Sequence, residues 1–475
     1  MKGKATMKIQ QSMITAKTLG SEAFKKDYQT KYAYYAGAMA NEISSVKMVI
    51  ALGQAGYLCS YGAGGVPLHK IEQAIDEIKQ ALPEGPYLVN VLHSPNHLAR
   101  EEALIDLLLK KSVKAIEASA FIEVSPAIIR YRLAGIKKCE DLGVYSENRV
   151  IAKVSREEVA IRFMSPPDSE VVMDLLRKGL ITKEQAQLAQ EIPVADDITA
   201  EADSGGHTDG QPFISLLPMM ICLRDKMQQQ LGVRQRIRIG AAGGISTSFA
   251  VVGAFKMGAD YVVTGSVNQG CIEAGTSNYV KEMLAKTAMA DVVMAPSADM
   301  FELGAKVQVI KKGTMFPMNA GKLYELYAKH GSLEELSEKD KKALETRIFR
   351  HDFDTIWRFV EEYFLEADPK QLIRAKDNPK LKMALIFRWY LGNSSRWAIQ
   401  GEEERKMDFQ VWCGKSMGAF NRCVAGTELE CWSNREVVKI ADKIMNGAAA
   451  IIEKDFISLF EINATMSHSP QEVNE

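Results

Sequence analysis

The sequence lacks the features that mark several large classes of protein. Its 59 Lys and Arg residues are balanced by 60 Asp and Glu residues, so the formal net charge is −1 and we expect no nucleic-acid partner. No apolar run approaches the roughly 20 residues that a membrane-spanning helix needs. The N-terminus, MKGKATMKIQ, has no apolar signal core. These absences predict a soluble, cytoplasmic protein without a membrane partner.

Cysteine is scarce and irregularly placed. The 7 cysteines are an odd count, and no two of them form a CxxC pair. This pattern favours reduced thiols over a disulfide framework or a zinc site. His93 and His97 are four residues apart, but Pro95 lies between them, so they are not a helical pair of metal ligands. We therefore predict no metal site.

The most informative stretch that is present runs from residue 236 to residue 267, RIRIGAAGGISTSFAVVGAFKMGADYVVTGSV. An apolar strand leads into Gly243-Gly244, a helix follows, and a second strand ends in Gly265-Ser266. Backbone N–H groups can approach a phosphate where no Cβ blocks them, and a helix N-terminus adds partial positive charge. The stretch therefore predicts a phosphate site, and the alternative is a pair of tight turns without a ligand.

Strand-like and helix-like segments alternate along the first 290 residues. The predicted strands are residues 32–38, 57–60, 87–92, 114–118, 149–154, 197–202, 237–241 and 261–264. This alternation indicates a parallel sheet, and eight strands favour an α/β fold of the TIM (β/α)8 barrel type. In such barrels the loops after the last two strands usually bind phosphate. The alternative is an open doubly wound sheet, but no GxGxxG motif opens the first βα turn.

We expect four segments along the chain. Residues 1–31 are polar and weakly periodic, and they predict a mobile or surface-lying lead. Residues 32–290 form the barrel. Residues 291–460, with highly charged helix-forming stretches and aromatic clusters, predict a mainly helical C-terminal addition, and residues 461–475 a flexible tail.

Three polar side chains near strand ends are candidates for chemistry. His207 follows Gly205-Gly206 after the sixth strand, where a His can donate a proton, although a structural His bonded to backbone is the alternative. Lys153 needs a charge partner, either a ligand such as a reduced flavin or a carboxylate of Glu117 or Glu201. Asn90 offers a donor and an acceptor to a heterocycle, or it orients a loop.

The loop after the sixth strand, EADSGGH at residues 201–207, resembles the E-A-G-G-H signature of the nitronate monooxygenase family of FMN barrels, which includes flavin-dependent enoyl-acyl-carrier-protein reductases. The motif is two residues longer here. In this, and in the blocks at 294–317, 387–397 and 411–421, the sequence is similar to the trans-acting enoyl reductases of polyketide and polyunsaturated fatty acid synthases. The resemblance covers nearly all of residues 32–453.

The resemblance implies an FMN- and NADPH-dependent reductase of 2-enoyl thioesters carried on the phosphopantetheine arm of an acyl carrier protein, within a synthase complex. It implies that His207 is catalytic, as a proton donor or as a partner of the carbonyl oxygen. The cofactor-binding residues that it implies are Gly243, Gly244, Gly265 and Ser266 for the phosphate and Ala38, Asn90, Lys153 and Gly206 for the isoalloxazine.

Partners and rival functions also follow from the resemblance. Enzymes of this type commonly self-associate, so the resemblance also implies a homodimer. An acidic carrier protein predicts a basic patch, for which the candidates are Lys306, Lys311, Lys312 and Lys322.

Three rival functions remain open from the sequence. A nitronate monooxygenase would use the same FMN and His207, and a flavin-holding synthase subunit would lack catalysis. A nucleotide dehydrogenase would need a catalytic Cys after the sixth strand, where Cys222 is poorly placed.

Overall fold

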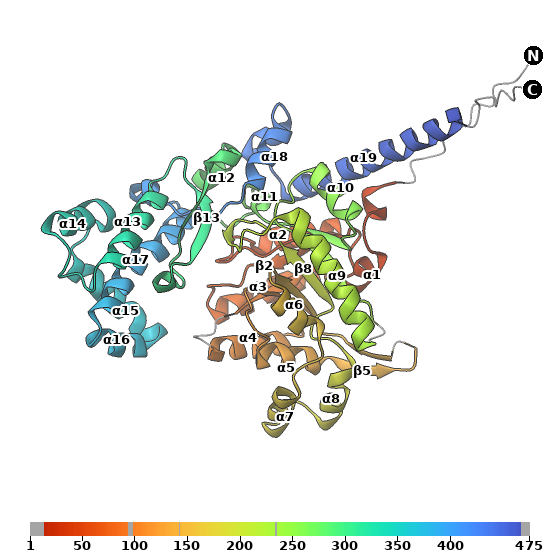
Figure 1. Cartoon of the computed structure of the whole chain (residues 1–475), viewed down its shortest axis with the longest axis horizontal. Coiled ribbons are helices and arrows are strands. Elements are labelled where there is room, and N and C mark those ends of the chain that lie inside the picture. Colours follow the sequence, from red (N-terminus) through yellow and green to blue (C-terminus); the bar gives the residue numbers. More distant parts are fainter. Residues whose placement is uncertain (1–13, 94–97, 142, 233–234, 467–475) are drawn as a thin grey trace, which may run out of the picture. The chain divides into compact units, whose positions relative to one another are not determined.

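The computed structural model describes residues 14–93, 98–141, 143–232 and 235–466. Within these, residues 14–200, 213–264 and 436–466 form one compact unit, called unit 1, and residues 201–212 and 265–435 form a second, called unit 2. Figure 1 labels the helices and strands of both units.

Unit 1 is a closed barrel of parallel strands (Figure 1). The order around the barrel is β1-β11-β10-β8-β7-β4-β3-β2. The strands are β1 Tyr34–Ala36, β2 Leu58–Tyr61, β3 Leu88–Leu92, β4 Ala115–Ser119, β7 Arg149–Val154, β8 Asp197–Glu201, β10 Arg238–Ala242 and β11 Tyr261–Thr264. Each predicted strand matches one of them to within two residues at either end. The predicted TIM barrel is therefore confirmed.

Helices surround the barrel and bury an apolar face against it. In α3 (Leu68–Ala81) the buried Ile71, Ile75 and Ile78 follow the helical repeat. The other helices of unit 1 are α1 Glu22–Asp27, α2 Val46–Ala55, α4 Leu98–Lys110, α5 Pro126–Ala134, α6 Glu157–Met164, α7 Ser169–Arg177, α8 Lys183–Leu188, α9 Phe213–Leu231, α10 Ser248–Lys256 and α19 Val437–Met466. A hairpin of β5 (Ile136–Cys139) and β6 (Gly143–Ser146), which the sequence pattern did not predict, follows α5.

The two observed units differ from the predicted domains. The prediction placed a single boundary between the barrel and the C-terminal addition, between residues 290 and 291. In the structure α19 returns to the barrel and packs against α10 and α2. Gly447 permits this approach, since a Cβ at this position would lie 2.1 Å from the Ser248 hydroxyl. Residues 461–466, predicted as flexible tail, continue α19, and residues 467–475 lie outside the described part of the chain.

The lead segment is a second correction. Residues 1–13 lie outside the described part of the chain, but α1 brings Phe24 and Tyr28 into an apolar cluster with Tyr35 and Tyr261. The Phe24 ring stacks on the Tyr261 ring with centroids 4.3 Å apart. Phe24 and Tyr28 are the only two aromatic residues of the polar stretch 20–31, which gives no detectable periodicity, so only packing against the barrel revealed their burial.

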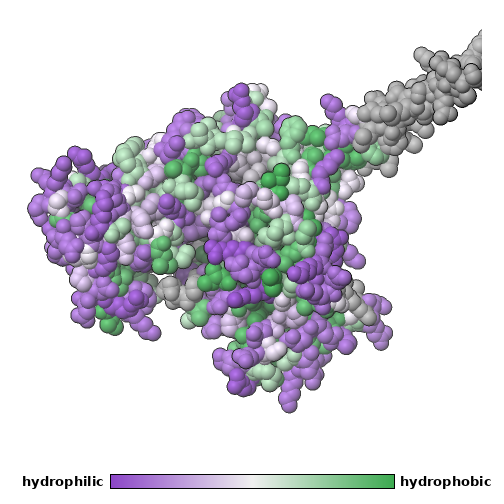
Figure 2. Space-filling view, viewed as in Figure 1, coloured by the Kyte–Doolittle hydropathy of each residue, from purple (hydrophilic) through white to green (hydrophobic). Residues whose placement is uncertain are grey.

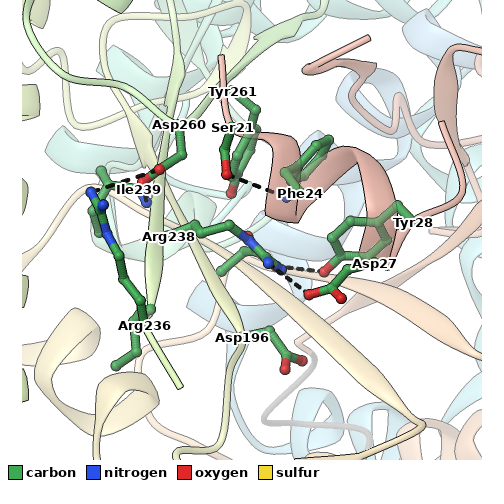
Figure 3. A network of polar contacts seen from close by, with 12 residues as sticks. Ser21, Phe24, Asp27, Tyr28, Asp196, Arg236, Arg238, Ile239, Asp260 and Tyr261 are labelled. Atoms are coloured by element: carbon green, nitrogen blue, oxygen red, sulfur yellow. Dashed lines mark hydrogen bonds and ion pairs between the residues drawn. The ribbon is translucent and has the colours of Figure 1, made fainter. Parts of the chain in front are cut away.

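Buried ion pairs lie at the amino ends of the strands, beside α1 (Figure 3). The Arg238 guanidinium contacts both Asp197 oxygens at 2.5 and 2.8 Å and Asp27 at 2.6 Å. Tyr28 donates to Asp197 at 2.6 Å. Burial by itself would lower the pKa of Arg238, but the charge of Asp197, the hydrogen bonds to it and the nearby Tyr28 and Asp27 together outweigh burial and raise the pKa. These groups join β8, β10 and α1 at the end of the barrel opposite the glycine turns.

Unit 2 combines a small sheet with helices. The sheet is antiparallel, in the order β12 (Val292–Pro296), β13 (Lys306–Ile310), β9 (Gly206–His207). The helices are α11 Ser266–Gln269, α12 Asn278–Ala285, α13 Phe316–Lys329, α14 Glu338–Ala343, α15 Phe353–Ala367, α16 Pro369–Lys376, α17 Pro379–Gln400 and α18 Ser416–Val424. The helical character predicted for the C-terminal addition is confirmed, and the sheet is an unpredicted feature.

The core of unit 2 is aromatic. Phe301, Phe349, Phe387 and Tyr390 are fully buried in one cluster. The surface over α14, in contrast, is mostly hydrophilic (Figure 2), as the Lys- and Glu-rich sequence there predicts. Within the described ranges no helix is long and apolar enough to cross a membrane.

Candidate functional site

The turn after β10 has the geometry of a phosphate cradle. Gly243 and Gly244 both adopt left-handed backbone conformations, with φ of 80° and 77°. A Cβ added to Gly244 would meet no atom within 4 Å, so the space over this backbone is open. Helix α10 follows, and its N-cap is Thr247, which accepts from the Ala250 N–H at 3.2 Å. Open space over left-handed glycines before a helix N-terminus fits a phosphate group.

Unit 2 carries the second glycine turn. Gly265 directly follows β11 in the chain, and a Cβ there would also meet nothing within 4 Å. The Ser266 hydroxyl accepts a hydrogen bond from the Gly414 N–H at 2.9 Å. A hydroxyl that accepts one bond keeps its proton for donation. Ser266 is therefore held in place with a donor available for an anion.

The three residues that the resemblance assigns to the isoalloxazine in unit 1 are each bonded to β4. The Lys153 ammonium lies 3.5 Å from a Glu117 carboxylate oxygen. The Ala38 N–H donates to the other oxygen of Glu117 at 3.0 Å. The Asn90 amide donates to the Glu117 carbonyl oxygen at 3.1 Å and to the Ser119 hydroxyl at 3.0 Å. Of the alternatives for Lys153, the structure therefore contains the Glu117 ion pair.

Glu117 and Ser119 are the residues that sequence reasoning missed as part of this site. Glu117 entered only as a counterion for Lys153, and Ser119 did not enter at all. The available signal was a carboxylate in the middle of the predicted strand, among the small and apolar residues of AIEAS, Ala115–Ser119. A fully buried carboxylate needs several polar partners, so its presence indicates a polar cluster.

His207 lies in unit 2 on strand β9, not on an irregular loop as predicted. It is opposite Val307 of β13. Its Nε2 atom lies 3.1 Å from the Ser297 hydroxyl and 3.8 Å from an Asp299 carboxylate oxygen, and its side chain is 48% exposed. The ring therefore has polar side-chain partners and is accessible to solvent, and it can hold and release a proton.

The block at 411–421 packs against the loop that carries His207. A Cβ on Gly205 would lie 2.8 Å from the Gly414 nitrogen and 2.9 Å from the Cys413 carbonyl carbon. Trp412 lies beside Gly206, at 3.9 Å from the position of a Cβ there. Gly414 also bonds Ser266, as described above. One segment of unit 2 thus fixes both Ser266 and the loop before His207.

We expect Gly205→Ala to displace this loop. The methyl group would overlap the backbone of Cys413 and Gly414, which cannot rotate away as a side chain can. Overpacking of this kind costs about 1–3 kcal/mol. Denaturant unfolding measures the loss, and Gly321→Ala in α13, where a Cβ meets nothing within 4 Å, is the matched control. Equal stability of the two variants would contradict the proposed contact.

The buried cysteines near the predicted site residues are not candidate nucleophiles. Burial raises the pKa of the Cys59 and Cys413 thiols above the usual range. Cys222 lies within α9 and not on the loop after β8, which argues against the nucleotide dehydrogenase alternative. Among the residues that the structure describes, no group of three or more His, Cys, Asp or Glu side chains is arranged to hold a metal ion.

The fold defines a class, the (β/α)8 barrels, in which the loops after the last two strands frequently bind phosphate. The chain belongs to the nitronate monooxygenase family, whose model matches residues 21–330. A second model, the inserted helical domain of [acyl-carrier-protein] S-malonyltransferase, matches residues 330–409 in unit 2.

Two curated relatives belong to biosynthetic systems. The polyketide biosynthesis protein PksE of Bacillus subtilis (strain 168) is 46% identical over 452 residues, which are 95% of this chain and 58% of PksE. A polyunsaturated fatty acid synthase protein of Thraustochytrium sp. is 45% identical over 437 residues, which are 90% of this chain and 29% of that protein. The chain thus spans little more than half of one relative and less than a third of the other.

Two solved structures are similar to the whole chain. The enoyl reductase domain of MlnA, from the macrolactin biosynthesis cluster of Bacillus amyloliquefaciens, is 44% identical with a TM-score of 0.89, covering 93% of this chain and 99% of that domain. FabK from Thermotoga maritima is 18% identical with a TM-score of 0.53, covering 91% and 97%, and shows the shared fold alone. The predicted family is confirmed, with enoyl reductase and synthase proteins among the relatives.

Proposed function

We propose that the protein is an FMN- and NADPH-dependent enoyl reductase, which acts in trans on 2-enoyl thioesters of an acyl carrier protein in a polyketide or polyunsaturated fatty acid synthase. The observation that carries this proposal is the likeness, at 44% identity over 93% of the chain, to a structure described as an enoyl reductase domain. The relatives from polyketide and polyunsaturated fatty acid synthesis support the synthase context.

Both glycine turns have the open backbone that a phosphate requires, and we propose Gly243, Gly244, Gly265 and Ser266 as the residues that hold the FMN phosphate. Ala38, Asn90, Lys153 and Gly206 are proposed for the isoalloxazine. When bound, FMN would supply the hydride chemistry between a nicotinamide and Cβ of the enoyl thioester. The residues of the chain orient the ring and the alkene for this transfer.

His207 is the proposed catalytic residue. Hydride addition at Cβ places negative charge on the thioester oxygen and Cα, so a donor there lowers the barrier. The Nε2 atom of His207 lies 3.1 Å from the Ser297 hydroxyl and 3.8 Å from an Asp299 carboxylate oxygen, so the ring is held in place and remains accessible to a substrate. In this role His207 donates a proton to Cα or a hydrogen bond to the thioester oxygen.

The proposed basic patch for the carrier protein is reduced in the structure. Lys312 pairs with Asp291 at 3.6 Å, and Lys322 pairs with Asp340 at 3.3 Å, so part of their charge is neutralised. Lys306 and Lys311 are exposed on the β13 segment of unit 2. We therefore propose that these two lysines attract the acidic carrier protein. Their charge would mainly raise the rate of association.

The test is anaerobic reduction of the bound flavin. We expect NADPH to bleach the flavin absorbance of the purified protein, and a carrier-bound 2-enoyl thioester to restore it faster than the free pantetheine thioester. His207→Ala should slow the restoration by about 10²–10⁴-fold, the range of general acid catalysis, without changing FMN content.

The same experiment separates the rival functions. Flavin that a nitronate bleaches, but that NADPH does not, and that oxygen then restores would indicate a nitronate monooxygenase, the activity for which the family model is named. Bound flavin that neither NADPH nor a nitronate bleaches would indicate a non-catalytic synthase component. Protein that neither contains FMN nor takes it up would overturn the proposed function as a whole.

A further inference from the structure

Glu117 lies at the centre of a polar cluster inside unit 1. Its side chain is fully buried, and Ser119, on the same strand, donates to its Oε1 atom at 3.2 Å. Its Oε1 atom is also the ion-pair partner of Lys153, and its Oε2 atom accepts from Ala38. One carboxylate thus receives a backbone N–H, a hydroxyl and an ammonium group.

These contacts connect four strands of the barrel. In the strand register Asn90 of β3 lies opposite Glu117, and Lys153 of β7 lies opposite Ser119. Ala38 follows β1, which is separated from β4 by β2 and β3 in the barrel order. The Glu117 side chain therefore reaches across the barrel, in addition to contacting its neighbouring strand. Each of the three groups proposed for the isoalloxazine in unit 1 is bonded to Glu117, to Ser119 or to both.

We infer that Glu117 is a positioning residue, which arranges Ala38, Asn90 and Lys153 before the flavin binds and offsets part of the Lys153 charge. This inference rests on the proposed function. A buried carboxylate 3.5 Å from an ammonium group weakens the attraction of that group for negative charge on a ligand. Reduction places negative charge on the isoalloxazine. Glu117 therefore limits how strongly the site prefers reduced over oxidised FMN.

Glu117→Gln tests this charge effect. Glutamine has nearly the same shape and can still accept from the Ala38 N–H, but it leaves the Lys153 charge without this counterion. We expect the ratio of the dissociation constants of oxidised and reduced FMN to rise about tenfold, which equals about +30 mV in the two-electron midpoint potential. Fluorescence titration gives the dissociation constant of oxidised FMN, and dye equilibration gives the potential, so neither measurement depends on turnover.

Three comparisons test whether Glu117 acts through the charge of Lys153 and through the positions of its partners. In a Lys153→Met background, Glu117→Gln should change the ratio less than twofold, because the residue acts through Lys153. Asp196→Asn removes another fully buried, ion-paired carboxylate, at the amino ends of the strands, and should lower stability while leaving the ratio unchanged. Ser119→Ala removes a hydroxyl that bonds both Glu117 and Asn90, and should weaken FMN binding severalfold without changing the ratio.

The outcomes distinguish this inference from the proposed function. A Glu117→Gln ratio within twofold of wild type, in protein that binds FMN, overturns the inference alone. A change in the ratio on Glu117→Gln that is equal in the wild-type and the Lys153→Met backgrounds also overturns the inference alone. If Glu117→Gln does not fold, unchanged FMN affinity in Ser119→Ala overturns the positioning role. Wild-type protein that binds no FMN overturns the proposed function and this inference together.

Discussion

Replacing Gly244 with valine is expected to remove FMN binding and to leave the barrel folded. Gly244 has a φ of 77°, which a β-branched side chain adopts only with strain. Its side chain would enter the open space over the glycine turn, where the proposed phosphate lies. Loss of one or two charge-assisted hydrogen bonds at about 1.5–3 kcal/mol each raises the dissociation constant roughly 10–10⁴-fold.

Fluorescence titration of the apoprotein with FMN measures this effect. The matched control is Gly253→Val in α10, where a Cβ meets nothing within 4 Å and the backbone is helical. We expect the control to bind FMN as the wild type does. Wild-type affinity in Gly244→Val would mean that the phosphate is held elsewhere, and the assignment of Gly243 and Gly244 would fail with it.

The second large effect concerns stability. Arg132 and Asp196 form a bidentate ion pair at 2.6 and 3.0 Å, and both side chains are fully buried. Asp196→Asn leaves the Arg132 guanidinium buried without this charge partner. Removal of one partner of a buried pair costs about 3–5 kcal/mol. Denaturant unfolding measures the change, and Asp174→Asn in the exposed ion pair with Lys178 should leave the stability close to wild type.

The stability contributed by Asp196 should depend on pH in a defined direction. Burial by itself raises the pKa of Asp196, but the charges of Arg132, Arg149 and Arg238 outweigh burial, so its pKa lies below the usual value. A carboxylate with a lowered pKa stabilises the folded state above its ordinary pKa and loses this effect as pH falls through the folded pKa. We expect the difference between wild type and Asp196→Asn to be constant above about pH 5 and to shrink below about pH 4. A difference that grows on acidification would contradict this assignment.

The barrel could be predicted because its signals are local. Most of the strands are short and largely apolar, since parallel strands covered on both faces are buried throughout, and glycine turns follow the last two. The strand β9 has two residues and pairs with β13, about a hundred positions later in the chain. No periodicity exists in two residues, so pattern reasoning placed His207 on a loop.

The unit bounds were missed for a related reason. Residues 437–460 were assigned to the predicted C-terminal addition, but the packing of α19 on α10 depends on a close approach at Gly447. The burial of Phe24 and Tyr28 depends in the same way on aromatic partners from distant strands. Both contacts depend on residues far away in the sequence, so the local pattern of one segment does not predict them.

By itself, the sequence determined the closed barrel, the two glycine turns and, through its motifs, the family. Whether Lys153 meets a ligand or a carboxylate was undecided by sequence, because both satisfy a buried ammonium group equally well. Only the tertiary structure decided that Glu117 lies beside Lys153 and also bonds Ala38 across the barrel. The physical reason is that strand register and barrel closure, which are set by packing over the whole chain, bring the backbone after β1 and side chains of β4 and β7 to one place.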